Sequence, residues 1–413
     1  MLNIPTHFSM NKVQSALFCL FVIAFSFAGP DVHSQSINSF NLSYTYNPSG
    51  PIQFKYRLVK SDPGYKVYFQ LNLPAYDTIG NYELNTFYRS SYSDSSAFNE
   101  TTHNWADLTD VSAYPQLAGK LAFMPSESQN IIVFHVKRPS TQKSFFFDVA
   151  LEGDNMFTPD GITPVDNNGM PVLKSFFSPR DSLSLTAEDT AQLYGFYYNM
   201  DFEEARPPMV IDTISGGKTM GIDSSFMMRV GYFSATKPGL YLFQTDSSSG
   251  SALAMRLAPF YYPKFVSVDE IIGTLRYISS KEEYNKLVSS KTRKKALDNF
   301  LLDISGSQDR AKRIMQNYFT RVAEANLLFT GFKEGWKTDA GMIYIIFGHP
   351  DVVERNDVGE VWTYLKMEDK SDLKFEFMRV KNIFTPGYLT LIRKDDYDRY
   401  WFRFVDLWRK GRI

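Results

Sequence analysis

Alternating apolar and polar residues predict β-strands in the first part of the chain. Residues 52–58 and 65–73 each place an apolar side chain at every second position, the pattern of a strand that buries one face. Between them, Ser61-Asp62-Pro63-Gly64 predicts a tight turn, because proline fixes one φ angle and glycine allows a positive one. We expect a β-sandwich over residues 36–152. Its further strands are expected at 131–136 and 145–151, with a serine- and asparagine-rich surface loop at 90–110.

A second β-rich domain is expected at residues 172–262. Its apolar pattern predicts strands at 226–233, 239–245 and 252–260. A linker rich in Asp, Asn, Gly and Pro precedes it at residues 153–171. These oxygen-bearing side chains suggest a calcium site, but their spacing does not match the EF-hand loop, and turn formation is the simpler interpretation.

After residue 263 the apolar residues recur every three or four positions, which predicts helices. Residues 267–270 and 280–283 each begin with Ser and end with Glu, the capping-box pattern of a helix N-terminus. The longest apolar stripe predicts a helix at 308–329 that packs into the core. Short strands are expected beyond it, at 342–347, 361–365 and 375–380.

These elements predict a multidomain β plus α+β fold. One or two N-terminal β-sandwich-like domains would be followed by a helical segment and a small α+β domain. A chain of 413 residues is long enough for two or three hydrophobic cores, and 16% aromatic residues favour β-structure. The expected boundaries are 1–35 for a signal peptide, 36–152, 153–171 for the linker, 172–262, and 263–413.

The first 35 residues have the pattern of a secretory signal. Lys12 precedes an apolar run at residues 16–28, which helix-breaking Gly29-Pro30 follows. The run is shorter than the roughly 20 residues that span a bilayer. We therefore expect an exported protein (periplasmic, outer-envelope associated or secreted) with no transmembrane span after signal removal; an uncleaved anchor is the alternative. The start, Met1 or Met10, and the cleavage site, after Ala28 or Ser34, stay open.

Charge and cysteine content limit the chemistry of the exported chain. Cys19, the single cysteine, lies inside the apolar run, so no disulfide, thiol nucleophile or thiolate metal site is expected after cleavage. The net charge of −1 hides a basic C-terminal third, with 27 Lys and Arg against 22 Asp and Glu from Lys264 onward. This excess is compatible with docking on an anionic surface and equally with ordinary solvated faces. No phosphate-binding loop or nucleic-acid-binding motif is present, so no cofactor and no nucleic acid partner is expected.

An aromatic segment ends the chain. As a helix it would place four aromatic residues on one side: Tyr397, Trp401, Phe404 and Trp408. Packing onto the small C-terminal sheet is one interpretation. The other is a surface for a protein partner or for peripheral membrane contact.

The most specific motif lies before the strand expected at 342–347. Residues 335–339 read Gly-Trp-Lys-Thr-Asp, followed by Gly341 and by Gly348, Pro350 and Asp351. Over residues 268–391 the chain resembles the GWxTD domain, a module of exported bacterial proteins that usually carry a signal peptide and β-sandwich regions ahead of it. The chain departs from that pattern with Ala340, where Arg is common, and with His349.

The motif has a structural and a functional interpretation. In the structural one, Gly335 bends the chain, Trp336 is a buried anchor, Thr338 and Asp339 cap free N–H groups, and Gly341 allows close backbone approach. The functional one groups Asp339 with residues of the following turn, His349, Asp351 and Glu354. Because a strand at 342–347 would hold residues 339 and 349 on the order of 20 Å apart, the turn residues are the closer set and could form a site on a loop. The histidine spacing does not fit helical zinc ligands, so no metal is expected.

Three functions remain open from the sequence. We favour an exported cell-envelope protein that acts as a non-enzymatic interaction or structural module with a protein partner. An extracytoplasmic hydrolase is the second hypothesis and needs two carboxylates roughly 5–10 Å apart in a cleft. Glycan binding on exposed aromatic side chains is the third.

Overall fold

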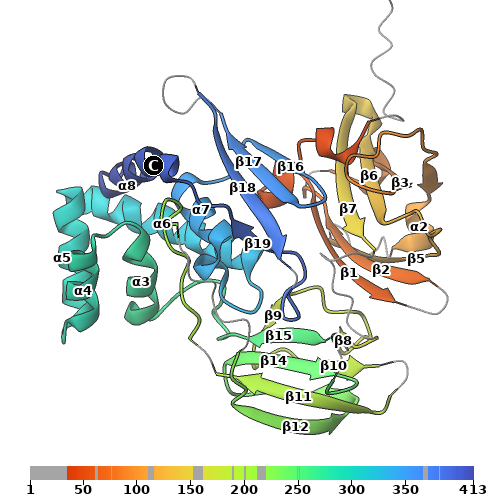
Figure 1. The fold of residues 1–413 in the computed structure, drawn as a ribbon, viewed down its shortest axis with the longest axis horizontal. Helices are drawn as coiled ribbons and strands as arrows, with labels where there is room; N and C mark the ends of the chain where they lie inside the picture. The colour runs from red at the N-terminus through yellow and green to blue at the C-terminus, as the bar shows by residue number, and fades with distance from the viewer. Residues whose placement is uncertain are drawn as a thin grey trace, which may run out of the picture.

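Two antiparallel sheets form the N-terminal part, red to yellow in Figure 1. The structure, a computed structural model, describes residues 35–60, 64–75, 77–109, 116–151, 161–187, 190–199, 201–211, 220–248, 250, 252–365, 371–380 and 382–413. The first sheet has the order β1 (Gln53–Lys60), β2 (Tyr65–Asn72), β5 (Gln116–Phe123). The second has the order β4 (Thr101–His103), β3 (Glu83–Arg89), β6 (Ile131–Arg138), β7 (Lys143–Ala150).

The strand predictions for this part are confirmed, but the loop prediction is only partly right. The segment expected as loop at 90–110 contains β4 and the short helix α2 (Trp105–Leu108), whose N-terminal N–H groups are capped by the Asn104 side chain. In the predicted turn, Gly64 has a φ of 96°, and residues 61–63 lie outside the described part. Single-turn 3₁₀ helices occur at η4 (Ile79–Asn81) and η6 (Pro139–Thr141).

Strand β6 is buried on both faces. Ile132 and Phe134 pack toward β1 and β2, whereas Ile131 and Val133 belong to a core that continues into the C-terminal third of the chain. Residues 37–46, with η2 (Ile37–Ser39) and η3 (Ser43–Tyr46), belong to this second core, in which the rings of Phe40 and Phe146 stack 4.0 Å apart. The β4–β3–β6–β7 sheet and the C-terminal third therefore share one core.

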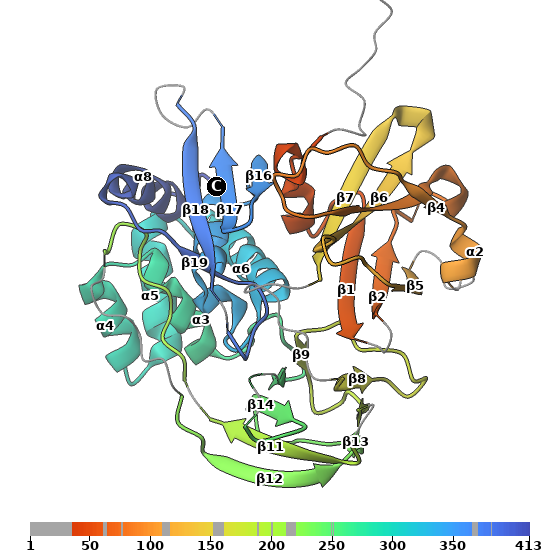
Figure 2. The same ribbon diagram turned by 45° about the vertical axis from the view of Figure 1, so that its right-hand side comes forward.

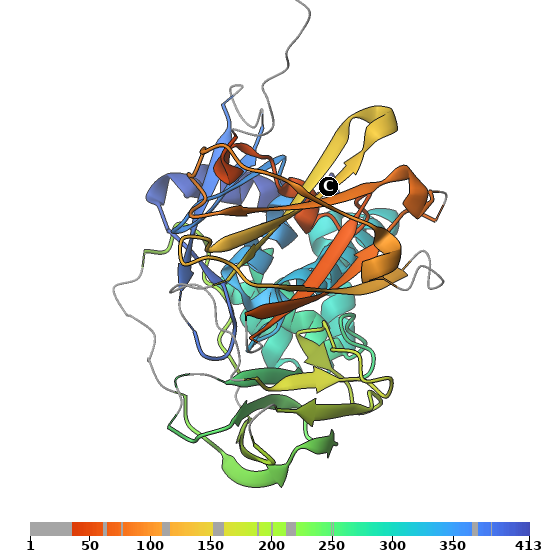
Figure 3. The ribbon, with the colours of Figure 1, turned by 90° about the vertical axis from the view of Figure 1, so that its right-hand side faces the viewer.

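The second β-rich part also contains two sheets, which lie below the first part in Figure 3. One has the order β12 (Ser224–Arg229), β11 (Gln192–Tyr198), β14 (Gly239–Gln244), β15 (Leu253–Leu257), β9 (Phe176–Phe177). The other has the order β13 (Gly231–Phe233), β10 (Leu183–Thr186), β8 (Thr163–Val165). The single strand predicted at 226–233 is wrong, because Gly231, with a φ of 130°, turns the chain from the first sheet into the second.

The described part of the linker, residues 161–171, contains strand β8 and a turn that follows it. Asp166 Oδ1 accepts hydrogen bonds of 2.9 Å from the N–H groups of Asn168 and Met170, and Gly169 has a φ of 75°. Asp154 and Asp160, which the calcium hypothesis also used, lie outside the described residues.

Four helices follow: α3 (Val268–Thr274), α4 (Lys281–Ser289), α5 (Arg293–Ser305) and α6 (Gln308–Phe329). Both predicted capping boxes form, and the bounds predicted for the long helix are confirmed. Helix α5 was not predicted; the Thr292 side chain does not cap it. The 3₁₀ helix η7 (Leu275–Tyr277) extends α3.

The strand predicted at 342–347 is a helix, α7 (Asp339–Phe347), which follows the 3₁₀ turn η8 (Gly335–Lys337). Every residue of α7 is buried, so the helix has no polar face. A short apolar run that is buried all round shows no period, and its isoleucines favoured the strand interpretation. As a helix it places residues 339 and 349 roughly 15 Å apart.

A four-stranded antiparallel sheet and a last helix complete the fold, at the left in Figure 2. The sheet runs β16 (Val352–Arg355), β17 (Gly359–Tyr364), β18 (Leu373–Val380), β19 (Tyr388–Leu391), followed by η10 (Asp395–Tyr397) and α8 (Asp398–Arg409). Within the described residues no helix is long and apolar enough to cross a membrane.

The aromatic side chains predicted as a possible partner surface lie inside the protein. Tyr397, Trp401 and Trp408 are 3%, 4% and 0% exposed, and the ring of half-buried Phe404 lies 4.7 Å from that of Phe347. The Trp408 indole N–H donates to the carbonyl of Ile346. The partner-surface prediction is therefore wrong, because these side chains pack on α7 and the C-terminal sheet.

Candidate functional site

The Gly-Trp-Lys-Thr-Asp segment is an internal junction. Thr338 is the N-cap of α7: its Oγ1 accepts from the N–H of Gly341 at 3.0 Å and donates to the carbonyl of Gly335 at 2.7 Å. A Cβ on Gly335 would lie 2.1 Å from the Ala325 carbonyl oxygen, and one on Gly341 would lie 1.9 Å from that of Gly335. Both glycines are required by close backbone contact, Gly335 against α6 and Gly341 against η8.

Trp336 is held by a residue that the sequence did not single out for a role. The Asn326 side chain, fully buried on α6, accepts from the Trp336 N–H at 3.0 Å and donates to the Pro263 carbonyl at 2.9 Å. The indole, 4% exposed, lies against Gly273. An asparagine on the apolar face of a predicted helix was the available signal, since a buried amide needs partners.

Asp339 ties the junction to the sheet. Its Oδ2 accepts from the Leu391 N–H at 2.9 Å, and its Oδ1 pairs with Arg393 at 2.6 Å. The adjacent Lys337 binds the connection between β11 and β12, through its carbonyl to the Ala205 N–H and its ammonium to Asp201. The motif side chains are therefore engaged in holding the fold.

The turn after α7 contacts the N-terminal segment. Gly348 ends the helix with a φ of 87°, and the following Pro350 is buried. His349 Nε2 donates to the Ser43 carbonyl at 2.8 Å, and the exposed Asp351 accepts from the Leu365 N–H at 2.8 Å. His349 and Asp351 are thus held by backbone groups, and neither they nor Glu354 line the cavity described below.

A buried ion network joins the N-terminal sheets to the C-terminal sheet. Arg355 of β16 pairs with Asp148 of β7 at 2.5 Å and with Glu360 of β17 at 2.8 Å. Tyr92 donates to the second oxygen of Asp148, and Tyr46 donates to that of Glu360. Each carboxylate thus has both oxygens occupied.

The network fixes the charge of its members. Burial would raise the pKa of Asp148, but Arg355, the Tyr92 hydroxyl and Arg379 outweigh it and hold the pKa below its ordinary value. Burial would lower the pKa of Arg355, whereas Asp148 and Glu360 raise it well above its ordinary value. Asp148 is therefore ionised at neutral pH and cannot serve as a general acid.

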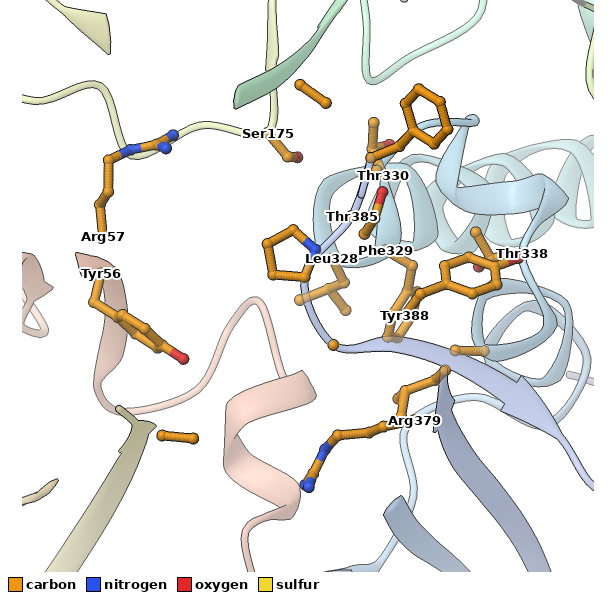
Figure 4. Close-up of a pocket in the computed structure, with 18 of the residues that line it drawn as sticks. Tyr56, Arg57, Ser175, Leu328, Phe329, Thr330, Thr338, Arg379, Thr385 and Tyr388 are labelled. Atoms are coloured by element: carbon orange, nitrogen blue, oxygen red, sulfur yellow. The ribbon is translucent and has the colours of Figure 1, made fainter. Parts of the chain in front are cut away.

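A cavity of about 530 Å³ lies beside this network, where the three parts of the chain meet. Strand β1 and the segment 173–175 form one side, and the end of α6 with residues 383–389 forms the other (Figure 4). The apolar part of its lining includes Leu328, Phe329, Ile383 and Phe384. The volume and the mixed lining are typical of a small-molecule site.

Two arginines of the lining are not ion-paired within the part of the chain that the structure describes. Arg57 Nε donates to the Val172 carbonyl at 2.9 Å, and burial lowers the pKa of Arg57 to about 10. Arg379 donates to the Asn356 carbonyl at 2.9 Å and lies over the Tyr92 ring, 4.9 Å from its centre. Figure 4 shows Arg57 and Tyr56 on one wall and Arg379 facing them from the other.

Tyr56 adds a hydroxyl group to the cavity. Its side chain is 37% exposed, yet burial raises its pKa to about 12, as expected for a phenol that opens onto an internal cavity and not onto bulk water. Ser175 is exposed on the segment 173–175, which lies on the same side of the lining as strand β1 (Figure 4). The cavity was not predictable, because its residues come from segments more than 300 positions apart.

A second cluster lies on the β4–β3–β6–β7 sheet. His135 Nδ1 lies 2.7 Å from Glu100 Oε1, and its Nε2 lies 2.8 Å from the Ser144 hydroxyl. Because a carboxylate only accepts, the imidazole N–H faces Glu100 and leaves Nε2 to accept from Ser144. His135 lies in the strand predicted at 131–136, and the sequence pattern alone does not pair it with Glu100 or Ser144. No group of three His, Cys, Asp or Glu residues suited to a metal occurs among the residues that the structure covers.

The comparisons with known proteins concern mainly the C-terminal part. A model of the GWxTD domain matches residues 239–410, which begins at β14 and so includes two strands of the second β-rich part. No curated protein matches the chain. Among solved structures, a chain described as "Crystal structure of DIP-gamma IG1+IG2" is similar at 12% identity, over 48% of this chain and 90% of that one, with a TM-score of 0.14. That score is too low to support a common fold.

Proposed function

Because this chain is a GWxTD domain-containing protein, we propose that it is an exported protein of the cell envelope that binds a molecule without converting it. The cavity between its three parts would be the binding site. The N-terminal apolar run, which lies outside the described residues, and the exported character of proteins that carry this domain support the location.

One observation carries the binding role: the cavity presents two arginines that form no direct ion pair within the described part of the chain, while both of its carboxylates are held by Arg355. Arg57 and Arg379 are available to a ligand, whereas Asp148 and Glu360 are both held by Arg355. Acid–base hydrolysis of a glycosidic bond needs a carboxyl group that carries a proton and one that is free. This lining favours binding over that chemistry.

The motif residues would have a supporting role in this function. Thr338 and Asp339 hold α7 and β19, and β19 adjoins the loop at 383–389 that lines the cavity. The GWxTD segment would thus keep one wall of the site in place. Mutation of its residues is expected to reduce stability and ligand binding together.

The test uses protein purified from its native envelope fraction. Native mass spectrometry should detect a bound small molecule in wild type and none in Ser175→Trp, which fills the cavity from an exposed position. Ser128→Trp, at an exposed serine that does not line the cavity, is the matched control and should retain the ligand. Recovery of the protein in the cytoplasm, or identical spectra for all three proteins, would refute the proposal.

The Ser144 cluster supports a hydrolase as a second candidate. Ser144 would attack an ester carbonyl as His135 accepts its proton, and His135 would return that proton to the leaving alcohol. Water would then release the acid and regenerate the serine. Ser144 is half-buried, and Glu100 would orient the imidazole.

Labelling with a fluorophosphonate probe tests this second candidate. Wild type should react and Ser144→Ala should not, whereas Ser126→Ala, at an exposed serine with no histidine partner, should react like wild type. An unlabelled wild-type protein would exclude it.

A further inference from the structure

The cavity has a chemical preference that identifies the class of its ligand. Its lining includes four cationic side chains, Arg57, Lys174, Arg355 and Arg379, and two carboxylates. Arg355 binds both carboxylates, and Lys174 lies 3.7 Å from Asp181 at the surface. Arg57 and Arg379 form no direct ion pair among the described residues. Arg379 interacts electrostatically with Asp148 and helps to lower its pKa, whereas burial alone accounts for the lowered pKa of Arg57.

Burial disfavours the charged guanidinium of Arg57, and a bound anion would offset that cost; at Arg379 it would add a second anionic partner beside Asp148. Arg57 and Arg379 are each only half-buried, so their free N–H groups can reach a molecule in the cavity. Each is positioned by a backbone carbonyl, that of Val172 for Arg57 and that of Asn356 for Arg379. Guanidinium groups fixed in this way match the two oxygens of a carboxylate or phosphate.

The remaining lining is suited to an apolar body. Leu328, Phe329, Ile383 and Phe384 are half-buried, so they keep apolar surface that neighbouring side chains do not cover. In Figure 4, Leu328 and Phe329 lie between the Thr385 segment and the wall that carries Arg379. A ligand with an anionic head at an arginine and a hydrocarbon body along these residues would satisfy both parts of the lining.

We propose that the cavity binds an anionic amphiphile, a carboxylate or phosphate monoester attached to an apolar body, with Arg57 and Arg379 as the anion-binding residues. This inference rests on the proposed binding function and specifies its ligand class. The Tyr56 hydroxyl, which opens onto the same cavity, donates a further hydrogen bond to the anion.

The experiment measures binding of four probes to the full chain by calorimetry: decanoate, decyl phosphate, decanol and inorganic phosphate. Decanoate and decyl phosphate should bind wild type at least tenfold more tightly than decanol or inorganic phosphate, since only they supply both head and body. Whichever of decanoate and decyl phosphate binds more tightly shows whether the site prefers a carboxylate or a phosphate head group.

Substitution of each cavity arginine tests which of them binds the anionic group. At least one of Arg57→Gln and Arg379→Gln should weaken the stronger probe about tenfold or more, the usual effect of losing a charged hydrogen bond, and the affected variant identifies the arginine that holds the head group. Decanol affinity should not change. Arg293→Gln, at an arginine whose side chain is 42% exposed and does not line the cavity, controls for the general loss of positive charge.

Decanol binding as tightly as decanoate, or unchanged affinity in both arginine variants, would overturn the inference. The results also distinguish a wrong ligand class from a wrong proposed function. If the native ligand is displaced by Ser175→Trp but is uncharged, the binding function stands and the anionic class is wrong; if nothing is bound and no probe binds, both fail.

Discussion

Replacement of Arg355 by methionine tests whether the ion network holds the N-terminal and C-terminal parts together. The Arg355 side chain is 16% exposed, and those of Asp148 and Glu360 are each 5% exposed. Methionine fills similar space but removes the arginine that pairs directly with both buried carboxylates. Loss of one partner from a buried network costs about 3–5 kcal/mol, and we expect the free energy of unfolding at pH 7.5 to fall by that amount.

The loss should depend on pH in a defined direction. In wild type the pKa of Asp148 is lowered, so its stabilising contribution is present above the unfolded-state pKa and disappears as pH falls through the folded-state pKa. In Arg355→Met, burial without Arg355 should raise the pKa of this carboxyl. The cost of burying the ionised carboxylate then applies near neutral pH and disappears as the carboxyl takes up a proton. The difference in the free energy of unfolding between wild type and variant should therefore become smaller from pH 7.5 to pH 5.

Urea denaturation at both pH values measures these free energies. Hydrogen exchange in residues 37–46 shows whether the contact between the N-terminal and C-terminal parts opens before the rest of the protein unfolds. Arg293→Met is the matched control, because Arg293 and its partner Asp269 are 42% and 65% exposed and such pairs contribute about 0–1 kcal/mol. A loss equal to that of the control, or one that does not change with pH, would refute the reasoning.

Three further pairs of variants test other parts of the account by thermal or urea unfolding. Trp408→Ala should lower the free energy of unfolding by about 3–5 kcal/mol, because the fully buried indole packs on α6 and α7. Phe402 is 63% exposed on the same helix, so Phe402→Ala should change that free energy by less than about 0.5 kcal/mol. Equal effects of the two substitutions would contradict the packing of α8. Gly335→Ala should lower the free energy of unfolding by about 2 kcal/mol or more, because the added Cβ meets the α6 backbone. Gly80→Ala should be near neutral, since a Cβ there meets nothing within 4 Å. A Gly335→Ala protein as stable as wild type would contradict the close packing of Gly335 on α6. Thr338→Val should lower the free energy of unfolding by about 1–2 kcal/mol through loss of the α7 N-cap, whereas Thr338→Ser keeps the hydroxyl and should be close to wild type. Equal losses in the two variants would show that the hydroxyl does not stabilise the helix.

Local patterns in the sequence were sufficient for much of the fold. The β1–β2 alternation, the serine-glutamate capping boxes and the stripe of α6 each express a physical preference of a few neighbouring residues. Helix α7 could not be recognised in this way, because its apolar residues are buried on every side and its cap depends on η8. The polar face that normally identifies a helix is missing there.

The candidate site could not be predicted for a different reason. Arg57, Arg355 and Arg379 look like ordinary charged residues in or near strands, and their environment is set by contacts between distant parts of the chain. The aromatic residues of α8 show the opposite error. Their spacing correctly predicted one apolar side of a helix, but spacing alone does not distinguish a partner-facing side from one that is covered by the chain itself.

The central claim is that the cavity between Arg57 and Arg379 is a ligand site, and a crystal structure of protein purified from the native envelope tests it most directly. The account predicts electron density for a bound molecule with its anionic group within hydrogen-bond distance of Arg57 or Arg379 and its apolar body along Leu328 and Phe329. A cavity that holds only water, or that side chains fill, would contradict the account.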